Sequence, residues 1–415
     1  MTANPNTVFD AGDDAADEIA DRRAEYDFVS ADVDRLAMVD DIRDRVDGDV
    51  RFDTYTRQLY ATDASAYEVT PIGVVYPEST DDVAATVAYC ATREIPVLPR
   101  GGGTSLAGQA VNEAVVLDFT RHMDGIVSVD PDDRLARVEA GTVLGDLNDA
   151  LAPHDLKFAP DPAASDRSAI GGAIGNNSTG AHSLVYGKTD AYIEECDAVL
   201  ADGTVVTLGE ISVEELRDSA DPDGSLLERV HSAVVRIIDE ESEEVRDRFP
   251  ELKRNVSGYN FDVLVEEAET GTVNLARLLA GSEGTLAVVT EAEVALEPVP
   301  ETKAVSLLFY ESVLEAVTDV QHVLAHEPAA VELIDDVLLG LARETTEFEE
   351  AASLVPDEAE AALLVEFYAD DDDHGREQTA GLLGDRVPGT DTEATPPTDW
   401  PAIDETIAFA GLEAH

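Results

Sequence analysis

The chain has 415 residues, and its 89 Asp and Glu residues outnumber its 27 Lys and Arg residues, which gives a formal net charge of −62. Binding to a nucleic-acid backbone or to an anionic membrane face requires clustered Lys and Arg, so this balance excludes both over any broad surface. An apolar content of 44% is nevertheless enough to build folded cores, so most of the chain is not a disordered acidic segment.

The N-terminal part of the chain is polar and acidic, with few large apolar side chains before residue 20. We expect residues 1 to about 20 to be disordered. Apolar residues then recur at helical spacing from Val33 to Val46, which predicts a helix. We therefore expect residues 1–50 to be an acidic extension with one helix.

Residues 51–299 alternate between short apolar runs and helical stretches. The apolar runs are separated by Gly, Pro and Asp and predict strands at 72–76, 95–98, 114–119, 126–129 and 135–138. We expect helices at 83–90, after Ser79 and Thr80 as cap residues, and at 143–151, after Thr142 as a cap residue. An Ala-Asp-Gly turn between strands at 195–200 and 204–208 predicts a hairpin, and an amphipathic helix is expected at 226–244.

The pattern changes after Pro298 and Pro300, which predicts a domain boundary close to Pro300. A β-α-β-α-β-α series follows, at 305–309, 313–325, 330–334, 337–343, 362–368 and 376–383. The acidic run Asp370–Asp373 is expected to be a solvated loop. The apolar ending near Phe409 looks interrupted, so we expect residues 300–415 to form a partial domain.

Two further features bear on the environment of the protein. The two cysteines, Cys90 and Cys196, have no partner spacing typical of a disulfide scaffold, a zinc site or a four-Cys iron–sulfur cluster. No apolar run approaches 18 residues and the N-terminus does not resemble a signal peptide, so we expect a cytoplasmic protein, peripheral to a membrane only through a partner. Because such a net charge repels itself unless salt screens it, we expect a halophilic protein of haloarchaeal-like composition.

The strongest local signal is a strand that runs into Gly101-Gly102-Gly103, followed by Thr104 and Ser105. Three consecutive glycines let backbone N–H groups converge on an anion. Because lysines are so few, these N–H groups together with Arg100 are candidates for holding a diphosphate. A tight loop would explain the same residues.

Two familiar phosphate-binding patterns nearly match this loop and fail. The dinucleotide-binding pattern needs a glycine where Leu106 stands, and the P-loop pattern needs Lys-Ser/Thr where Gln109-Ala110 stands. Two more clusters rich in Gly, Asn and Ser follow at 160–187 and 280–290, and such residues suit a backbone that lies against an extended ligand. Any one cluster can be structural, but three together favour a large nucleotide cofactor.

These segments, in this order, resemble the FAD-linked oxidase family, and within it the D-lactate dehydrogenase and glycolate oxidase flavoprotein subunits. The resemblance covers about residues 50–340. It rests on the segments 99–109, 160–162, 170–181, 254–260 and 281–286. It implies an α+β fold, in which a PCMH-type FAD-binding domain of two α+β subdomains, at 51–299, precedes a partial ferredoxin-like cap domain.

The resemblance also implies a binding site for non-covalent FAD. The pyrophosphate would lie on Arg100, Gly101, Gly102, Gly103, Thr104, Ser105 and Gln109. The flavin ring and ribityl chain would be lined by Pro160, Asp161, Asn176, Asn177, Ser178, Gly180 and Ala181. The adenine end would lie near Ile170, Gly171, Gly172, Gly284, Thr285 and Val289. His182 is a candidate polar group near the ring, and a loop histidine bonded to backbone is the alternative.

Members of this family oxidise a 2-hydroxy acid, here D-lactate or glycolate, by hydride transfer to flavin N5, and a separate acceptor, such as an iron–sulfur partner protein, takes the electrons. Their H-x-G-D-G-N-x-H metal-binding segment is not found in this sequence, and we expect no metal. His322 and His326 stand at i, i+4, yet surface histidines explain them better.

We therefore leave the catalytic residues unassigned. Arg254 and Tyr259 are weak candidates for substrate contacts, with turn packing as the alternative. The competing hypothesis is a non-catalytic or electron-relay FAD-binding module, or a fragment, that needs a partner chain.

Overall fold

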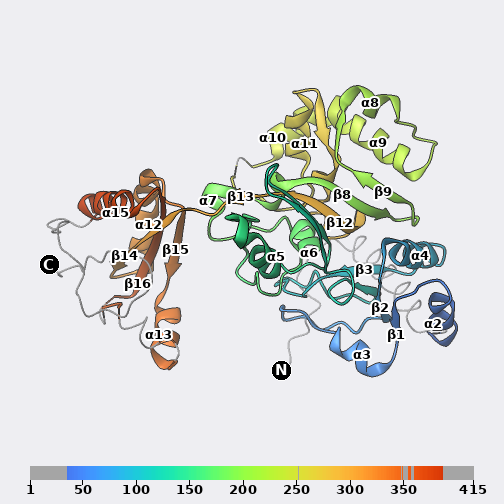
Figure 1. The fold of residues 1–415 in the computed structure, drawn as a ribbon, viewed down its shortest axis with the longest axis horizontal. Coiled ribbons are helices and arrows are strands. Elements are labelled where there is room, and N and C mark those ends of the chain that lie inside the picture. Colours follow the sequence, from blue (N-terminus) through green and yellow to red (C-terminus); the bar gives the residue numbers. More distant parts are fainter. Residues whose placement is uncertain (1–34, 251, 347, 349–353, 357–358, 387–415) are drawn as a thin grey trace, which may run out of the picture.

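The computed structural model describes residues 35–386, apart from 251, 347, 349–353 and 357–358. The expected disorder of residues 1–20 and the interrupted ending near Phe409 lie outside the described residues. Figure 1 shows a larger body and a smaller sheet domain that meet where α7 (Ser183–Tyr186) and β13 (Glu297–Pro298) lie. The predicted mixture of helices and strands is confirmed, and the α+β fold with it.

The first sheet of the larger body has the strand order β1-β2-β4-β3. The strands are β1 (Asp49–Arg51), β2 (Gly73–Tyr76), β4 (Val115–Asp118) and β3 (Val97–Arg100). The last three run parallel, and β1 pairs with β2 in the antiparallel sense. Helices α2 (Arg35–Arg43) and α4 (Thr80–Ala91) add Ile42 and Val83 to its core, and α3 (Thr54–Leu59) follows β1. The predicted cap of α4 is confirmed, because the Ser79 hydroxyl accepts a hydrogen bond from the Asp82 amide.

The second sheet is antiparallel, with the order β5-β6-β12-β8-β9. Its strands are β5 (Ile126–Asp130), β6 (Leu135–Glu139), β12 (Ala287–Ala295), β8 (Ile193–Leu200) and β9 (Val205–Leu208), and the predicted hairpin is β8 with β9. Buried Leu144 of α5 (Leu144–Leu151) and Ile174 of α6 (Ile170–Asn176) belong to its core. The predicted cap of α5 is wrong, since Thr142 instead donates to the Gly125 carbonyl at 3.1 Å.

A helical lobe is inserted between β9 and β12. It contains β10 (Glu210–Ser212), α8 (Val213–Asp218), α9 (Leu226–Arg236), α10 (Ser242–Arg248), α11 (Phe261–Ala268) and β11 (Thr272–Asn274). The helix expected at 226–244 is in place, but a π-helical turn at Ile237–Glu241 interrupts it before α10 begins.

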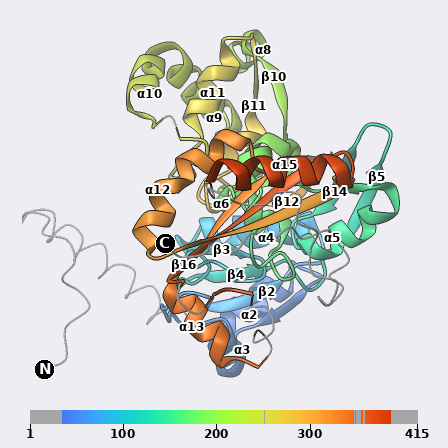
Figure 2. The ribbon, with the colours of Figure 1, turned by 90° about the vertical axis from the view of Figure 1, so that its left-hand side faces the viewer.

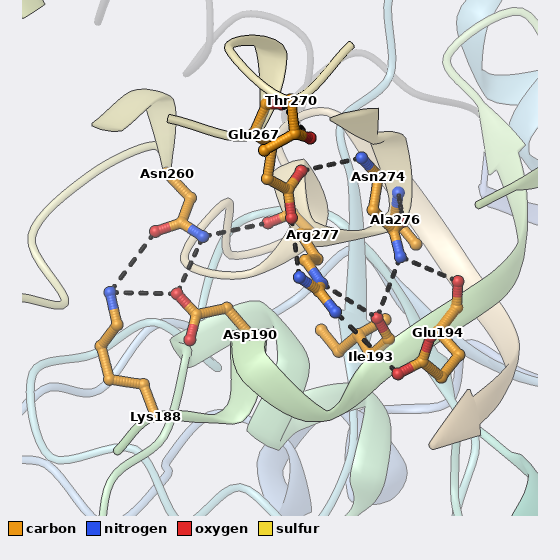
Figure 3. A network of polar contacts seen from close by, with 10 residues as sticks. All are labelled: Lys188, Asp190, Ile193, Glu194, Asn260, Glu267, Thr270, Asn274, Ala276 and Arg277. Atoms are coloured by element: carbon orange, nitrogen blue, oxygen red, sulfur yellow. Dashed lines mark hydrogen bonds and ion pairs between the residues drawn. The ribbon is translucent and has the colours of Figure 1, made fainter. Parts of the chain in front are cut away.

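A polar network joins this lobe to the rest of the larger body (Figure 3). The Lys188 ammonium lies 3.0 Å from a carboxylate oxygen of Asp190, and the Asn260 side-chain amide donates to the same oxygen at 2.9 Å. Further along, Arg277 pairs with Glu267 at 2.7 Å. Because Asn260 follows directly on the segment 254–259, the network fixes the end of that segment against the body.

The smaller domain contains an antiparallel sheet with the order β14-β16-β15. Its strands are β14 (Thr302–Tyr310), β16 (Ala361–Ala369) and β15 (Ala330–Ile334), with α13 (Asp336–Glu344) after β15. Helices α12 (Val313–Val323) and α15 (Asp372–Arg386) lie over the strands in Figure 2, and they share a core with Phe367. The predicted β-α-β-α-β-α series is thus confirmed.

One expectation for this domain is wrong. Asp372 and Asp373, expected in a solvated loop, form the first turn of α15. The reason is electrostatic, because the N-terminal turn of a helix carries partial positive charge that favours carboxylates.

Candidate cofactor site and domain junction

A cavity of about 910 Å³ lies at the glycine-rich segments of the larger body. This volume is within the range of small-molecule and cofactor pockets. Its wall is formed by the loop after β3, the segment that enters α6, and the turn before β12. Of the predicted cofactor residues, it includes Arg100, Gly101, Gly102, Gly103, Thr104, Ser105, Gln109, Gly171, Gly172, Asn176, Ser178, Gly284 and Val289.

Side-chain bonds tie the three glycine clusters together around this cavity. The Thr104 and Ser168 hydroxyl oxygens are 3.1 Å apart, which joins the first cluster to the second. The Gln109 amide donates to the Glu283 carboxylate at 3.3 Å, which joins the first to the third. Segments far apart in the sequence therefore form one wall.

The backbone of the first cluster is suited to an anion. In the described part of the chain, no amide N–H group of Gly101–Ser105 donates a hydrogen bond to another residue. Because these residues line the cavity, their N–H groups are available to an anionic ligand, as in a backbone nest.

The glycines of this wall differ in what a side chain would meet. A Cβ on Gly102 would lie 1.9 Å from the Arg167 carbonyl oxygen, so no side chain fits there. A Cβ on Gly172 would meet no protein atom within 4 Å, although this residue lines the cavity. Gly172 is therefore open toward the space that a ligand would fill.

Arg100 lines the cavity and also holds the loop that forms its wall. Its guanidinium donates to the carbonyl oxygens of Thr62 and Ala110, both at 2.8 Å, and lies 5.2 Å from the centre of the Tyr60 ring. Burial lowers the pKa of this group. In this geometry the Arg100 side chain ties the loop to Thr62 and Ala110, and its contact with the pyrophosphate stays a prediction.

Other predicted cofactor residues lie away from the cavity wall. These are Pro160, Asp161, Ile170, Asn177, Gly180, Ala181 and Thr285. The Ile170 side chain is fully buried in the core. The Asn177 side chain holds Asp190, by accepting from its amide at 3.0 Å and donating to its carboxylate at 3.3 Å. Ile170 and Asn177 therefore hold neighbouring parts of the fold in place and do not line the cavity themselves.

Several lining residues were not predicted as site residues, among them Ala64, Arg167, Ser168 and Glu283. Arg167, Ser168 and Glu283 lie within the clusters at 160–187 and 280–290, and this position was the available signal. Nothing in the sequence indicated Ala64, because only the tertiary fold brings the 62–64 segment to the loop.

A second polar centre lies where the two domains meet. His182, directly before α7, bonds through Nδ1 to the Asp161 carboxylate and through Nε2 to Glu366 of β16 at 2.8 Å. Its ring stacks on Tyr368, with the ring centres 5.5 Å apart. The bonds to Asp161 and Glu366 raise the pKa of His182 to about 9, so the imidazole is protonated at neutral pH.

Two lysines flank the same centre. The Lys303 ammonium lies 3.5 Å from the Glu366 oxygen that also contacts His182. Burial alone would raise the pKa of Glu366, but the His182 bond and the Lys303 charge take it below its ordinary value. The Lys157 ammonium lies 4.3 Å from the Tyr186 ring centre. Asp161 directly precedes Pro162, so this junction borders one end of the cavity.

His182 is poorly suited to take a proton from a substrate hydroxyl. A general base must be unprotonated at the working pH, whereas both ring nitrogens of His182 bond to carboxylates. The structure therefore gives this histidine a joining role between the domains. The alternative considered from the sequence, a loop histidine bonded to backbone, is wrong, since the partners are side chains, and a position near the flavin ring stays a prediction.

The weak substrate candidates lie beside the glycine clusters. The Arg254 guanidinium donates to the Gly180 carbonyl at 3.1 Å. The Tyr259 hydroxyl lies 2.9 Å from the Thr285 hydroxyl. Because Thr285 was expected near the adenine and Tyr259 near the substrate, this contact places side by side two residues that were expected at opposite ends of the cofactor.

The remaining reactive side chains do not gather into a further site. Burial raises the pKa of both Cys90 and Cys196 to about 12. His322 pairs with Asp319, while His326 pairs with Asp385. Within the residues that the structure describes, no group of three or more His, Cys, Asp and Glu side chains is arranged to hold a metal ion. Among these residues, too, none forms a helix with the length and apolarity needed to span a membrane.

Comparison with known proteins agrees with this geometry. Residues 71–209 match the FAD binding domain, and residues 299–399 match the C-terminal domain of FAD linked oxidases. The chain belongs to the FAD-linked oxidases. The cofactor of this FAD-linked oxidase is FAD, and the glycine-lined cavity with its unpaired N–H groups fits a cofactor that carries a pyrophosphate.

Relatives of this FAD-linked oxidase act on several substrates. D-2-hydroxyglutarate dehydrogenase of Escherichia coli is 33% identical over 78% of this chain and 32% of its own length. Glycolate oxidase subunit GlcD of Bacillus subtilis is 30% identical over 78% of this chain and 57% of its own length. D-lactate dehydrogenase of Archaeoglobus fulgidus is 29% identical over 75% of this chain and 57% of its own length. The chain thus spans between about a third and somewhat more than half of the length of these relatives.

Solved structures support the fold of this FAD-linked oxidase. An alkyldihydroxyacetonephosphate synthase superposes with a TM-score of 0.57 at 18% sequence identity. The match covers 81% of this chain and 56% of that protein. At this identity the likeness extends to the fold alone.

Proposed function

We propose that this FAD-linked oxidase oxidises a 2-hydroxy acid to the 2-oxo acid and passes the electrons to a separate acceptor. The observation that carries the proposal is the cavity itself, in which three glycine clusters form one wall with unpaired amide donors. The names of the matched relatives support the substrate class, because glycolate, D-lactate and D-2-hydroxyglutarate are all 2-hydroxy acids.

The chain's own residues would bind and orient the reactants. The amide groups of Gly101–Ser105 would hold the pyrophosphate without needing a cation, which suits a protein this acidic. When bound, FAD supplies the hydride acceptor. The junction at Asp161, His182 and Glu366 would hold the cap domain beside the Pro162 end of the cavity.

D-lactate and glycolate are the substrates that the sequence led us to expect. The relatives widen this choice, since D-2-hydroxyglutarate dehydrogenases from several bacteria match at 33% identity. We propose that the substrate is a 2-hydroxy acid whose carboxylate is required for binding. The cap domain would determine which substituent the substrate carries beyond the hydroxyl-bearing carbon.

The test is spectroscopic. The protein is purified in about 2–4 M KCl, where the screening length is near 3 Å or less, and loaded with FAD. Its visible spectrum is then recorded without oxygen before and after addition of glycolate, D-lactate or D-2-hydroxyglutarate. The expected result is bleaching of the flavin by at least one of them and none by acetate or glutarate, which lack the hydroxyl. Yellow protein that no hydroxy acid bleaches would contradict the proposal.

The alternative is an FAD-binding module that reacts only with a partner chain. It is favoured by the relative named as a subunit, glycolate oxidase subunit GlcD of Bacillus subtilis. Under this alternative the protein binds FAD and stays yellow with every hydroxy acid. Bleaching would then appear only when a second polypeptide is added.

A further inference from the structure

The lysines of this chain are unevenly placed. The sequence has four, and all four contact the segment that runs from residue 180 to 190 or the tyrosines packed on it. Lys157 lies over Tyr186, Lys188 pairs with Asp190, and Lys253 donates to the Leu184 carbonyl. Lys157 and Lys303 lie at the domain junction itself, so two of the four ammonium groups of a protein with a net charge of −62 gather there.

The cations at the junction differ in whether a carboxylate contacts them directly. Protonated His182 and Lys303 are balanced by Asp161 and Glu366, which they contact directly. The Lys157 ammonium makes no ion pair or hydrogen bond in the described part of the chain, and its pKa is lowered, chiefly by burial. Asp161, Glu366 and Glu297, which lies opposite Lys157 in the β7 (Leu156–Lys157) and β13 ladder, raise that pKa without contacting the ammonium directly.

The surroundings of Lys157 come from both domains. Its ammonium lies 4.3 Å from the Tyr186 ring centre in the larger body and 5.4 Å from the Tyr368 ring centre in the cap domain. Such faces stabilise a cation without neutralising it. The Tyr368 hydroxyl is itself buried with no hydrogen-bond partner in the described part of the chain. Two unsatisfied donors therefore occur together, and a single carboxylate could satisfy both.

We propose that Lys157 and the Tyr368 hydroxyl bind a carboxylate of the substrate at the domain junction, beside the end of the cavity near Pro162. This assignment rests on the proposed function for the identity of the ligand, a 2-hydroxy acid. Because one donor belongs to each domain, the same carboxylate also joins the cap to the larger body.

The scarcity of lysine permits a test that does not depend on turnover. The FAD-loaded protein is acetylated with acetic anhydride, and the label on each of the four lysines is measured by peptide mass spectrometry. Glycolate, D-lactate or D-2-hydroxyglutarate is expected to slow labelling of Lys157 at least about tenfold, while exposed Lys253 is labelled at an unchanged rate. Ethylene glycol, which lacks the carboxylate, should slow labelling of neither Lys157 nor Lys253. A sample with added KCl of equal ionic strength controls for charge screening by the hydroxy-acid salt.

Variants give the second measurement. Binding of the same hydroxy acids is followed through perturbation of the flavin spectrum. Lys157→Met should weaken binding about tenfold to 100-fold, because a charge-assisted hydrogen bond is lost, while Lys157→Arg should retain most of it. Tyr368→Phe keeps the ring and should weaken binding less. Lys253→Met is the matched control, with no expected change.

The outcomes separate this inference from the proposed function. If a hydroxy acid bleaches the flavin but Lys157 is labelled equally with and without it, the carboxylate site is wrong and the proposed function stands. If Lys157 is protected and the flavin is never bleached, the site stands and the proposed oxidation is wrong. Unprotected Lys157 at every hydroxy-acid concentration up to the solubility limit overturns the inference, whatever the flavin does.

Discussion

The glycine-lined cavity and the domain junction both set hydrogen-bond donors against negative charge in a very acidic protein, but they do so by different means. The cavity uses backbone amides of Gly101–Ser105, which need no counter-charge. The junction uses side-chain charges, with His182 and Lys303 set against Asp161 and Glu366. The first arrangement is local in sequence, whereas the second joins residues up to 205 positions apart, from Asp161 to Glu366.

The difference teaches that the two sites respond to different perturbations. A backbone nest depends on the shape of the loop, so a single added carbon atom can abolish it. Its amide groups do not titrate, so it is unaffected by pH. A charged junction tolerates changes in shape but depends on protonation and on each partner's charge. The following variants are arranged to test this contrast.

The largest effect is expected for Gly102→Ala. The new Cβ would lie 1.9 Å from the Arg167 carbonyl oxygen, and overpacking of this kind costs about 3 kcal/mol. We expect loss of FAD binding, measured by fluorescence titration of the flavin. Gly172→Ala should not lower the melting temperature yet should weaken FAD binding, since its Cβ meets only the cavity. Gly340→Ala, whose Cβ meets nothing on α13, should leave FAD binding unchanged and raise the melting temperature slightly, because alanine favours the helix.

The next largest effect is expected for Glu366→Gln. The variant removes the negative charge that contacts both His182 and Lys303. A hydrogen bond to a charged group contributes about 2 kcal/mol to the free energy of unfolding. Urea unfolding at constant KCl should show this loss of stability. Glu332→Gln, an exposed position on neighbouring β15, should change the free energy of unfolding by less than about 0.5 kcal/mol. Equal effects of the two variants would contradict the assigned junction.

A pH effect should follow from His182. Its pKa is raised from 6.5 to about 9 in the folded protein, so protonation favours folding. The contribution is complete below pH about 6.5 and is lost as the pH rises through about 9. The melting temperature of the native protein should therefore fall more between pH 7.5 and 9.5 than that of His182→Gln. Parallel pH curves for the two proteins would show that the junction does not titrate.

The smallest effect is expected for Tyr259→Phe. It removes the hydrogen bond between the Tyr259 and Thr285 hydroxyls, which is worth about 1 kcal/mol. If this bond is the residue's main role, stability falls slightly and the KM for the hydroxy acid stays constant, which is the outcome we expect. A raised KM at unchanged stability would instead support Tyr259 as a substrate contact.

Much of the architecture was predictable because it depends on local pattern. Short apolar runs indicated β2, β4 and β6, and the hairpin of β8 with β9 followed from an Asp202-Gly203 turn. The errors arose where tertiary contacts override local preference. Thr142 resembles a helix cap, yet its hydroxyl is taken by the Gly125 carbonyl. The division of the chain at residues 50 and 300 stays a prediction.

The sequence by itself predicted three glycine clusters that share a cofactor, because glycine density and order are visible in one dimension. From a charge of −62 and four lysines it also predicted that phosphate is held mainly through backbone N–H groups. Only the tertiary structure showed that Arg100 ties its loop to Thr62 and Ala110, and that Lys157, His182, Lys303 and Glu366 meet between two domains. The physical reason is that charge pairing depends on distances of a few ångströms, which side-chain identity alone cannot specify.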